Sequence, residues 1–76
     1  MRPEDIRELR DADPFIPFRI CLTDGKSYDV PHRGFLMISR TVIDIGVASD
    51  SATRVYDRIV RVSPLQIVRV ENLQAA

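Results

Sequence analysis

Hydrophobic and polar residues alternate through the first part of the chain in a pattern typical of a β-hairpin. Apolar residues occupy alternate positions from Phe18 to Leu22, and the pair Asp24-Gly25 separates them from a second alternating run that ends at Val30. Alternation places every second side chain on the same face of a strand, and Asp-Gly is typical of a tight turn. The pattern therefore predicts two antiparallel strands whose apolar residues face a common core.

Three further strands are predicted on the same grounds. One long bent strand over residues 37–47 is favoured over two short strands, because the corner of a barrel needs a bend. A polar loop at 49–52 precedes a strand at about 55–62, and a single helical turn at 63–66 precedes a last strand around 68–70. The predicted core residues share one parity along each strand: Phe18, Ile20, Leu22, Tyr28, Val30, Ile43, Ile45, Val60, Val62, Val68 and Val70.

A short helix is predicted over residues 3–12. Pro3 suits the first helical position, and the acidic residues after it suit the positive end of the helix dipole. Ile6 and Leu9 form one short apolar stripe, which is too little to stabilise an isolated helix of this length. The helix is therefore expected to dock on its own sheet or on a neighbouring subunit.

Together these elements predict a mainly β fold with one N-terminal helix. The expected architecture is a five-stranded, strongly bent antiparallel sheet or small barrel. It forms a single domain over residues 1–76, with the helix at 3–12 and the barrel at 15–73. A chain of 76 residues can build only one core, and its single cysteine excludes a disulfide framework. Small folds of this kind often gain stability by self-association.

The charge balance changes the functional picture. There are 11 basic and 11 acidic residues, so the formal net charge is zero, which is weak for a protein that grips a phosphate backbone by bulk charge. No segment approaches the length of a membrane-spanning helix, and the charged N-terminal region does not resemble a secretory signal. With a single thiol, these features predict a cytoplasmic protein.

The order of helix, short strands and a helical turn before the last strand resembles the small Sm-like barrel, a relative of the Src-homology-type barrel. The segment ICLTDGK at residues 20–26 looks like the first strand and turn of Sm-like proteins. The uridine pocket of that family uses an Asp-x-aromatic-x-Asn run and a late Arg-Gly pair. Residues 29–32 (DVPH) and 68–71 (VRVE) stand in those places here. The resemblance therefore implies the fold without the RNA-binding motifs.

Two longer phrases resemble a group of small, uncharacterised bacterial proteins. They are PFIPFRICLTDGKSYDVPHRGF and RIVRVSPLQIVRVENL, and the shared features are a Pro-Phe-x-Pro-Phe-Arg run, an Asp-Gly hairpin turn, a His near a Phe and a closing Leu-x-Ile-x-Arg phrase. The likeness covers nearly the whole chain. It implies a stand-alone cytoplasmic bacterial protein and carries no activity with it.

The sequence predicts no catalytic residue, no cofactor site and no metal site. Cys21 and His32 are the only soft nucleophile or metal-ligand candidates. Cys21 falls in the middle of a strand, which is a poor position for a nucleophile, and His32 falls in a turn. The acidic residues show no paired spacing for a two-carboxylate mechanism, and the isolated glycines make no phosphate-binding loop.

The strongest functional lead is a set of arginines on the outer face of the predicted barrel. If the last two strands pair, Arg61 and Arg69 can share that face and form a basic strip suited to phosphate or to an acidic partner. Cross-strand ion pairs with Asp57 and Glu71 explain the same residues and are favoured. The candidate binding face comprises Arg40, Arg54, Arg58, Arg61 and Arg69.

These observations favour a non-enzymatic small barrel that acts as a protein-interaction or self-assembling binding module. The alternative is a nucleic-acid-binding regulator, of RNA or DNA, that uses the arginine-rich face. The expected partners are a second copy of the chain, as a dimer or small ring, and another protein. The predicted interaction edges are the strands at 54–62 and 37–47, because short strands leave backbone groups that another chain can pair.

Overall fold

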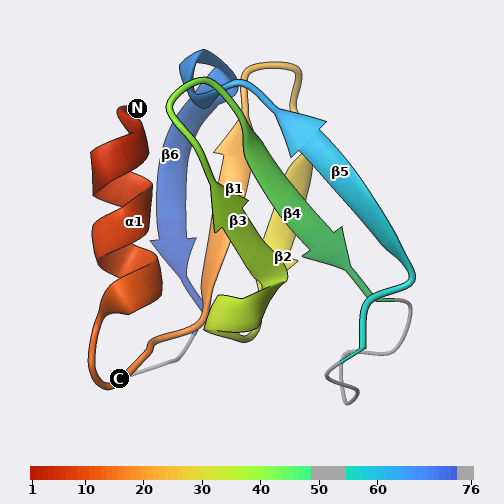
Figure 1. Cartoon of the computed structure of the whole chain (residues 1–76). Coiled ribbons are helices and arrows are strands. Elements are labelled where there is room, and N and C mark those ends of the chain that lie inside the picture. The colour runs from red at the N-terminus through yellow and green to blue at the C-terminus, as the bar shows by residue number, and fades with distance from the viewer. Residues whose placement is uncertain (49–54, 74–76) are drawn as a thin grey trace.

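The computed structural model describes residues 1–48 and 55–73, which contain two three-stranded antiparallel sheets and one α-helix (Figure 1). The first sheet has the strand order β2-β1-β6 and the second β3-β4-β5. The prediction of a mainly β fold with an N-terminal helix is therefore confirmed. The elements in chain order are α1 (Pro3–Asp11), β1 (Phe18–Leu22), β2 (Ser27–Val30), the 3-10 helix η1 (Arg33–Phe35), β3 (Leu36–Ile38), β4 (Ile43–Val47), β5 (Arg58–Val62), the 3-10 helix η2 (Pro64–Gln66) and β6 (Ile67–Asn72).

The strands do not join into the single five-stranded sheet or closed barrel that the sequence predicted. Within the described residues, β2 pairs only with β1, and β5 pairs only with β4. Pro31 has no backbone N–H to continue the β2 ladder, and η1 follows it, so no continuous strand bends from the first sheet into the second. η2 separates β5 from β6 in the same way. The two sheets therefore face each other with open sides between them.

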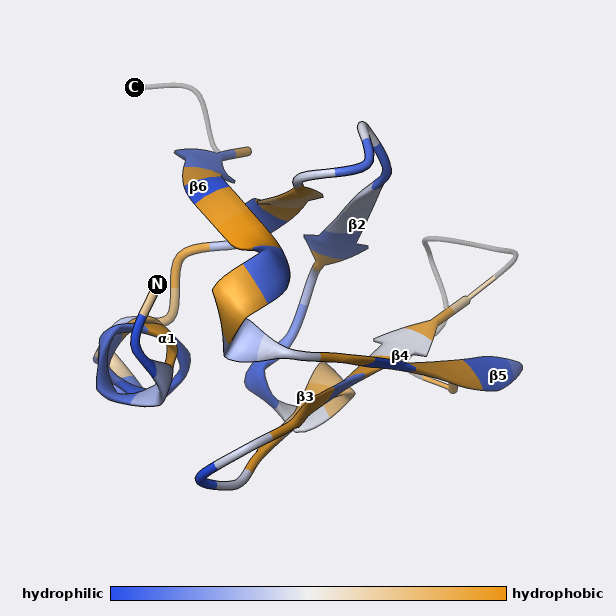
Figure 2. Ribbon diagram, turned by 90° about the horizontal axis from the view of Figure 1, so that it is seen from above, coloured by the Kyte–Doolittle hydropathy of each residue, from blue (hydrophilic) through white to orange (hydrophobic). Residues whose placement is uncertain are grey.

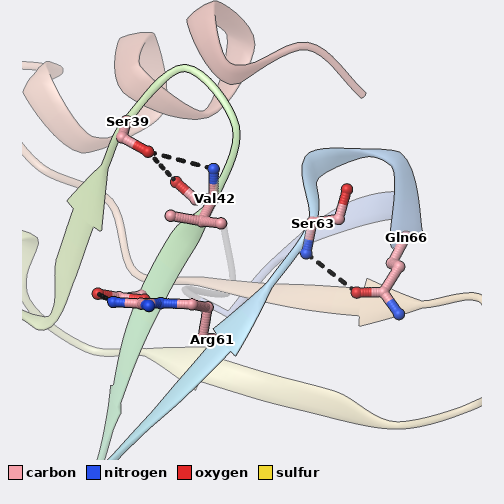
Figure 3. A network of polar contacts seen from close by, with 6 residues as sticks. Ser39, Val42, Arg61, Ser63 and Gln66 are labelled. Atoms are coloured by element: carbon pink, nitrogen blue, oxygen red, sulfur yellow. Dashed lines mark hydrogen bonds and ion pairs between the residues drawn. The ribbon is translucent and has the colours of Figure 1, made fainter.

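The predicted long strand at 37–47 is wrong, because it is a hairpin of β3 and β4. The Ser39 hydroxyl donates to the Val42 carbonyl at 3.1 Å and accepts from the Val42 N–H at 3.2 Å, which fixes a tight turn (Figure 3). The reversal pairs Leu36 with Ile45, so Leu36 is buried. In one continuous strand Met37 would share the parity of Ile43 and Ile45, but in the hairpin it is 63% exposed.

The first hairpin follows its prediction. The Gly25 N–H donates to the Leu22 carbonyl at 3.1 Å, and Gly25 has a φ of +87°, the left-handed conformation that glycine adopts without steric cost. The Asp24 carboxylate accepts the Lys26 N–H at 2.9 Å and closes the turn from the other side. The resulting pairing of Phe18 with Val30 buries both residues completely.

A β-bulge in β6 corrects the predicted core of the last strand. Cys21 pairs with Arg69 and Leu22 pairs with Ile67, so Val68 is an extra residue between the two pairs. The bulge changes which side chains face inward. Ile67 is therefore buried at 3% exposure, whereas Val68, predicted to be in the core, is 54% exposed.

The helix docks within its own chain. Pro3 occupies its first turn together with Glu4, and the Asp5 carboxylate accepts the Arg2 N–H at 3.3 Å. Ile6 is fully buried, and Leu9 packs against the same core. Seen from above, α1 lies end-on beside β6 and β3, so it covers one open side between the two sheets (Figure 2). Of the two docking sites expected for this helix, its own sheets and a neighbouring subunit, the helix uses its own sheets.

One hydrophobic core joins the helix to both sheets. Of the predicted core, Tyr28, Val60 and Val70 are partly buried and pack against it. The β5 strand begins at Arg58, three residues later than predicted, and the predicted polar loop at 49–52 lies outside the described residues. The buried cluster consists of Ile6, Phe18, Ile20, Leu22, Val30, Phe35, Leu36, Ile43, Ile45, Val62 and Ile67.

Candidate interaction surfaces

The two arginines expected to share an outer face are each engaged by a carboxylate, on different sheets. The Arg61 guanidinium on β5 donates to Asp44 on β4 at 2.8 and 3.1 Å. This hydrogen bond, aided by the attraction of opposite charges, holds the pKa of Asp44 below its usual value. Arg69 on β6 donates to Glu71 at 2.9 Å, and the pKa of Arg69 is raised, mainly by this bond. The strand pairing that would bring Arg61 and Arg69 together does not occur, because β5 pairs with β4 and β6 pairs with β1.

Arg40 and Arg58 are the other described members of the candidate face, and they lie at opposite ends of the second sheet. Arg40 lies in the β3–β4 turn, whereas Arg58 begins β5 opposite Val47, at the far end of β4. Neither makes an ion pair with another described residue. Arg54 lies outside the described residues. The arginines that the structure describes therefore form separate sites rather than one strip.

Cys21 and His32 lie apart from each other. Cys21 is 8% exposed, one residue before the end of β1, where it borders a shallow hollow with Arg69 and Lys26. His32 precedes η1, and its ring centroid lies 5.7 Å from that of Phe35, in a different hollow. The two side chains do not form a nucleophile–base pair. Among residues 1–48 and 55–73, no three His, Cys, Asp or Glu side chains gather in a way that could hold a metal ion.

A cleft of about 510 Å³ lies between the two sheets, and we call it the mouth cleft. A hollow of similar volume, about 570 Å³, lies near the start of α1, beside Arg40 and Leu65. The mouth cleft lies where β1 and β5 begin and where β2, β4 and β6 end. Its lining includes residues of β2 and β5. These two strands lie on the side of the molecule away from α1 (Figure 2). The apolar lining residues of the mouth cleft are Pro17, Tyr28, Pro31, Phe35, Val47, Ala48 and Leu73.

The polar groups of the mouth cleft are few and specific. Arg19 donates from Nε to Asp29 Oδ1 at 2.7 Å, and its Nη1 lies 4.0 Å from Glu71 Oε1. The hydrogen bond to Asp29 is the main cause of the raised pKa of Arg19. Arg58 lines the cleft without a carboxylate partner among the described residues, and Ser27 lies at the rim. Apolar walls with a few polar groups are typical of a binding site, and no sequence pattern indicated this one, because five strand ends build it.

A second surface is the outer face of the β3-β4-β5 sheet. Met37 is 63% and Ile59 56% exposed there. Both line a small depression with Gly46, against which the Tyr56 ring packs. β5 is the edge strand of this sheet, whereas β4, part of the predicted 37–47 edge, is central. The face therefore combines exposed apolar side chains with an open strand edge.

Comparison of the chain with protein-family models, with curated proteins and with solved structures found no match. Within the described residues, no helix has the length and apolar character required to cross a lipid bilayer.

Proposed function

We propose that the protein is a non-enzymatic binding module that holds a segment of a partner protein in the mouth cleft. The observation that carries the proposal is the cleft itself, whose lining is mostly apolar and includes the exposed Arg58. The rim of the cleft includes β2, an edge strand to which another chain can add. The separation of Cys21 from His32 also supports a binding role over nucleophilic catalysis.

The proposed architecture is that of a small Sm-like barrel left open on one side. The order of strands and the short helix η2 before the last strand support this proposal. A cytoplasmic, bacterial setting is part of the same proposal. It is supported by the single thiol and by the resemblance to small bacterial proteins.

Site-specific photo-cross-linking tests the binding role. A benzophenone amino acid at Leu73, which lines the mouth cleft and is 37% exposed, should cross-link a protein partner in the source cells. The matched control is the same group at Leu65, which is 87% exposed and lines a different hollow. Cross-links that are equal at both positions, or absent at Leu73, would contradict the proposal.

Self-assembly is a second proposed property, and the outer face of the β3-β4-β5 sheet supports it. Two copies could pair their β5 edges and bury Ile59, in the symmetric arrangement that identical chains most often adopt. Ile59→Lys should then dissociate the oligomer, while Val68→Lys, at a similarly exposed position on the other sheet, should not. Light scattering coupled to size-exclusion chromatography measures the mass in solution. A mass of 8.7 kDa, that of one chain, at every wild-type concentration would refute self-assembly.

Nucleic-acid binding remains the alternative function, and its support is narrower. It would depend on Arg40 and Arg58, because Arg61 and Arg69 are held by carboxylates. An electrophoretic shift with RNA or DNA that weakens steeply with salt would favour this alternative. We favour the protein partner because the walls of the mouth cleft are mostly apolar.

A further inference from the structure

The hydrogen-bond pattern of the first sheet shows which backbone groups of β2 are free. Leu22 N–H donates to the Lys26 carbonyl at 2.8 Å, and Leu73 N–H donates to the Pro17 carbonyl at 3.0 Å. Because bonded and non-bonded pairs alternate in an antiparallel ladder, even-numbered residues of β1 bond to β2 and odd-numbered residues bond to β6. Ser27 and Asp29 pair with odd-numbered residues of β1, so their own N–H and C=O groups point away from it.

This free edge is short and borders the mouth cleft. Ser27 and Asp29 are both exposed and both line the cleft, and no described strand pairs with β2 on that side. Pro31 has no N–H to donate, so the free edge of β2 ends there. It presents only the outward-facing backbone groups of Ser27 and Asp29 to another strand. Two such residues with two donors and two acceptors suit a short stretch of extended peptide.

The charged residues of the cleft indicate that the bound peptide is acidic. Asp29 is neutralised by Arg19 at 2.7 Å, so it does not repel an acidic ligand strongly. Arg58 then remains as a guanidinium without a carboxylate among the described residues of the cleft. Arg58 is exposed, so a ligand can reach it, and a guanidinium can pair with a carboxylate through two parallel hydrogen bonds that also fix its orientation.

We propose that the mouth cleft binds an extended, acidic segment of a partner protein as an added strand along β2, with one carboxylate of the segment paired to Arg58. The inference rests on the proposed function and adds the chemistry of the ligand to it. The apolar side chains of the segment occupy the wall formed by Tyr28, Phe35 and Leu73.

Selection from a display library of random short peptides tests the charge requirement. The wild-type protein should enrich peptides that carry an acidic residue beside apolar residues, and Arg58→Glu should enrich basic residues instead. Arg40→Glu is the matched control, because Arg40 is also exposed and without a described carboxylate partner but lies outside the cleft. Enriched peptides that do not change between wild type and Arg58→Glu would overturn the inference.

A second pair of variants tests the added strand. Ser27→Pro removes the outward N–H while leaving the β1–β2 bonds intact, and Ser27→Ala keeps that N–H. The selected peptide should bind Ser27→Pro roughly tenfold more weakly, the usual effect of losing one such hydrogen bond, and should bind Ser27→Ala unchanged. Thermal melts show whether Ser27→Pro is folded. If it is not, N-methylation of alternate amides of the selected peptide tests the same backbone bonds on the wild-type protein, and unchanged binding of every methylated peptide would overturn the added strand.

The outcomes separate the two proposals. Peptides that bind without dependence on Arg58 or Ser27, together with cross-links at Leu73, would overturn the acidic-strand inference and leave the binding role in place. A library that yields no peptide would also overturn the inference. The binding role itself would be removed by cross-links that are absent at Leu73 or equal at Leu73 and Leu65.

Discussion

Gly46→Ala is expected to destabilise the protein, because the added methyl group would collide with an aromatic ring. A Cβ atom built on Gly46 would lie 2.5 Å from Cδ1 and 2.6 Å from Cγ of Tyr56, far inside van der Waals contact. Gly46 lies in the central strand β4, so the backbone cannot easily retreat. The Tyr56 ring must move instead, and its edge-on contact with Phe35, at a centroid distance of 5.2 Å, would be lost.

The magnitude follows from two opposing effects. Overpacking typically costs about 1–3 kcal/mol, which includes the displaced ring. An aromatic pair contributes about 0.5–1.5 kcal/mol beyond its buried area, so loss of the Phe35 contact accounts for part of that cost. Replacing glycine within a strand recovers about 0.5–1 kcal/mol of backbone entropy. The expected net loss in the free energy of unfolding is about 1–2 kcal/mol, which lowers Tm by about 4–8 °C for each kcal/mol in a domain of this size.

A double-mutant cycle with Tyr56→Ala separates the collision from other effects of the substitution. Urea denaturation of the wild type, both single variants and the double variant gives the coupling energy. In the Tyr56→Ala background, Gly46→Ala should be neutral or slightly stabilising, because the methyl group meets no ring. An equal loss in both backgrounds, or a neutral Gly46→Ala in the wild type, would refute the reasoning.

Three further outcomes are expected. Ile67→Ala should lower the free energy of unfolding by about 2–5 kcal/mol, whereas Val68→Ala should change it by about 0.5 kcal/mol or less. Equal losses for the two variants in urea denaturation would contradict a bulge at Val68. Cys21→Ser should remain folded and keep the partner binding of the wild type, since Cys21 forms no disulfide, and a wild-type dimer that reductant dissolves would contradict this. Because Arg61 lowers the folded-state pKa of Asp44, the stability from this pair is fully present above the unfolded pKa, about 4, and is lost as pH falls from there through the lower folded-state pKa. Asp44→Asn should therefore weaken the acid dependence of Tm, and identical pH profiles would exclude the pair as a contributor.

Local patterns predicted the elements whose structure is fixed by neighbouring residues. The Asp24-Gly25 turn and the alternation from Phe18 to Val30 suffice for the first hairpin, since turn and register are set within that segment. The helix start at Pro3 was predictable for the same reason. These features depend on backbone preferences that the sequence carries directly.

The remaining features depend on a turn, a bulge and long-range contacts, none of which the alternation of apolar and polar residues along a strand can predict. Ser39 reverses the chain through a side-chain bond to Val42, which turns the expected continuous strand into a hairpin and exposes Met37. The bulge at Val68 inserts one residue, so Ile67 faces inward in place of Val68, whereas Val70 keeps its predicted side. The mouth cleft was not predictable at all, because residues from Pro17 to Leu73 meet there only after both sheets have formed.

The placement of β6 beside β1 has a consequence for the order of folding during synthesis. The second sheet is a meander of neighbours in sequence, β3, β4 and β5, whereas the first sheet pairs Ile20 with Val70. Contacts between distant residues require closure of a long loop and form late, and the ribosome releases the N-terminal part of a chain first. β1 and β2 therefore leave the ribosome as an isolated hairpin, which is only marginally stable in water.

A nascent chain that ends before Ile67 is accordingly expected to bury its second sheet only in part and to expose the inner face of the β1–β2 hairpin. Limited proteolysis of ribosome-bound chains of increasing length should show protection of β1 only after β6 has emerged. Protection of β1 before that point would mean that the hairpin finds its partners without the last strand. The emergence of β6 thus determines when β1 becomes protected from proteolysis and from aggregation.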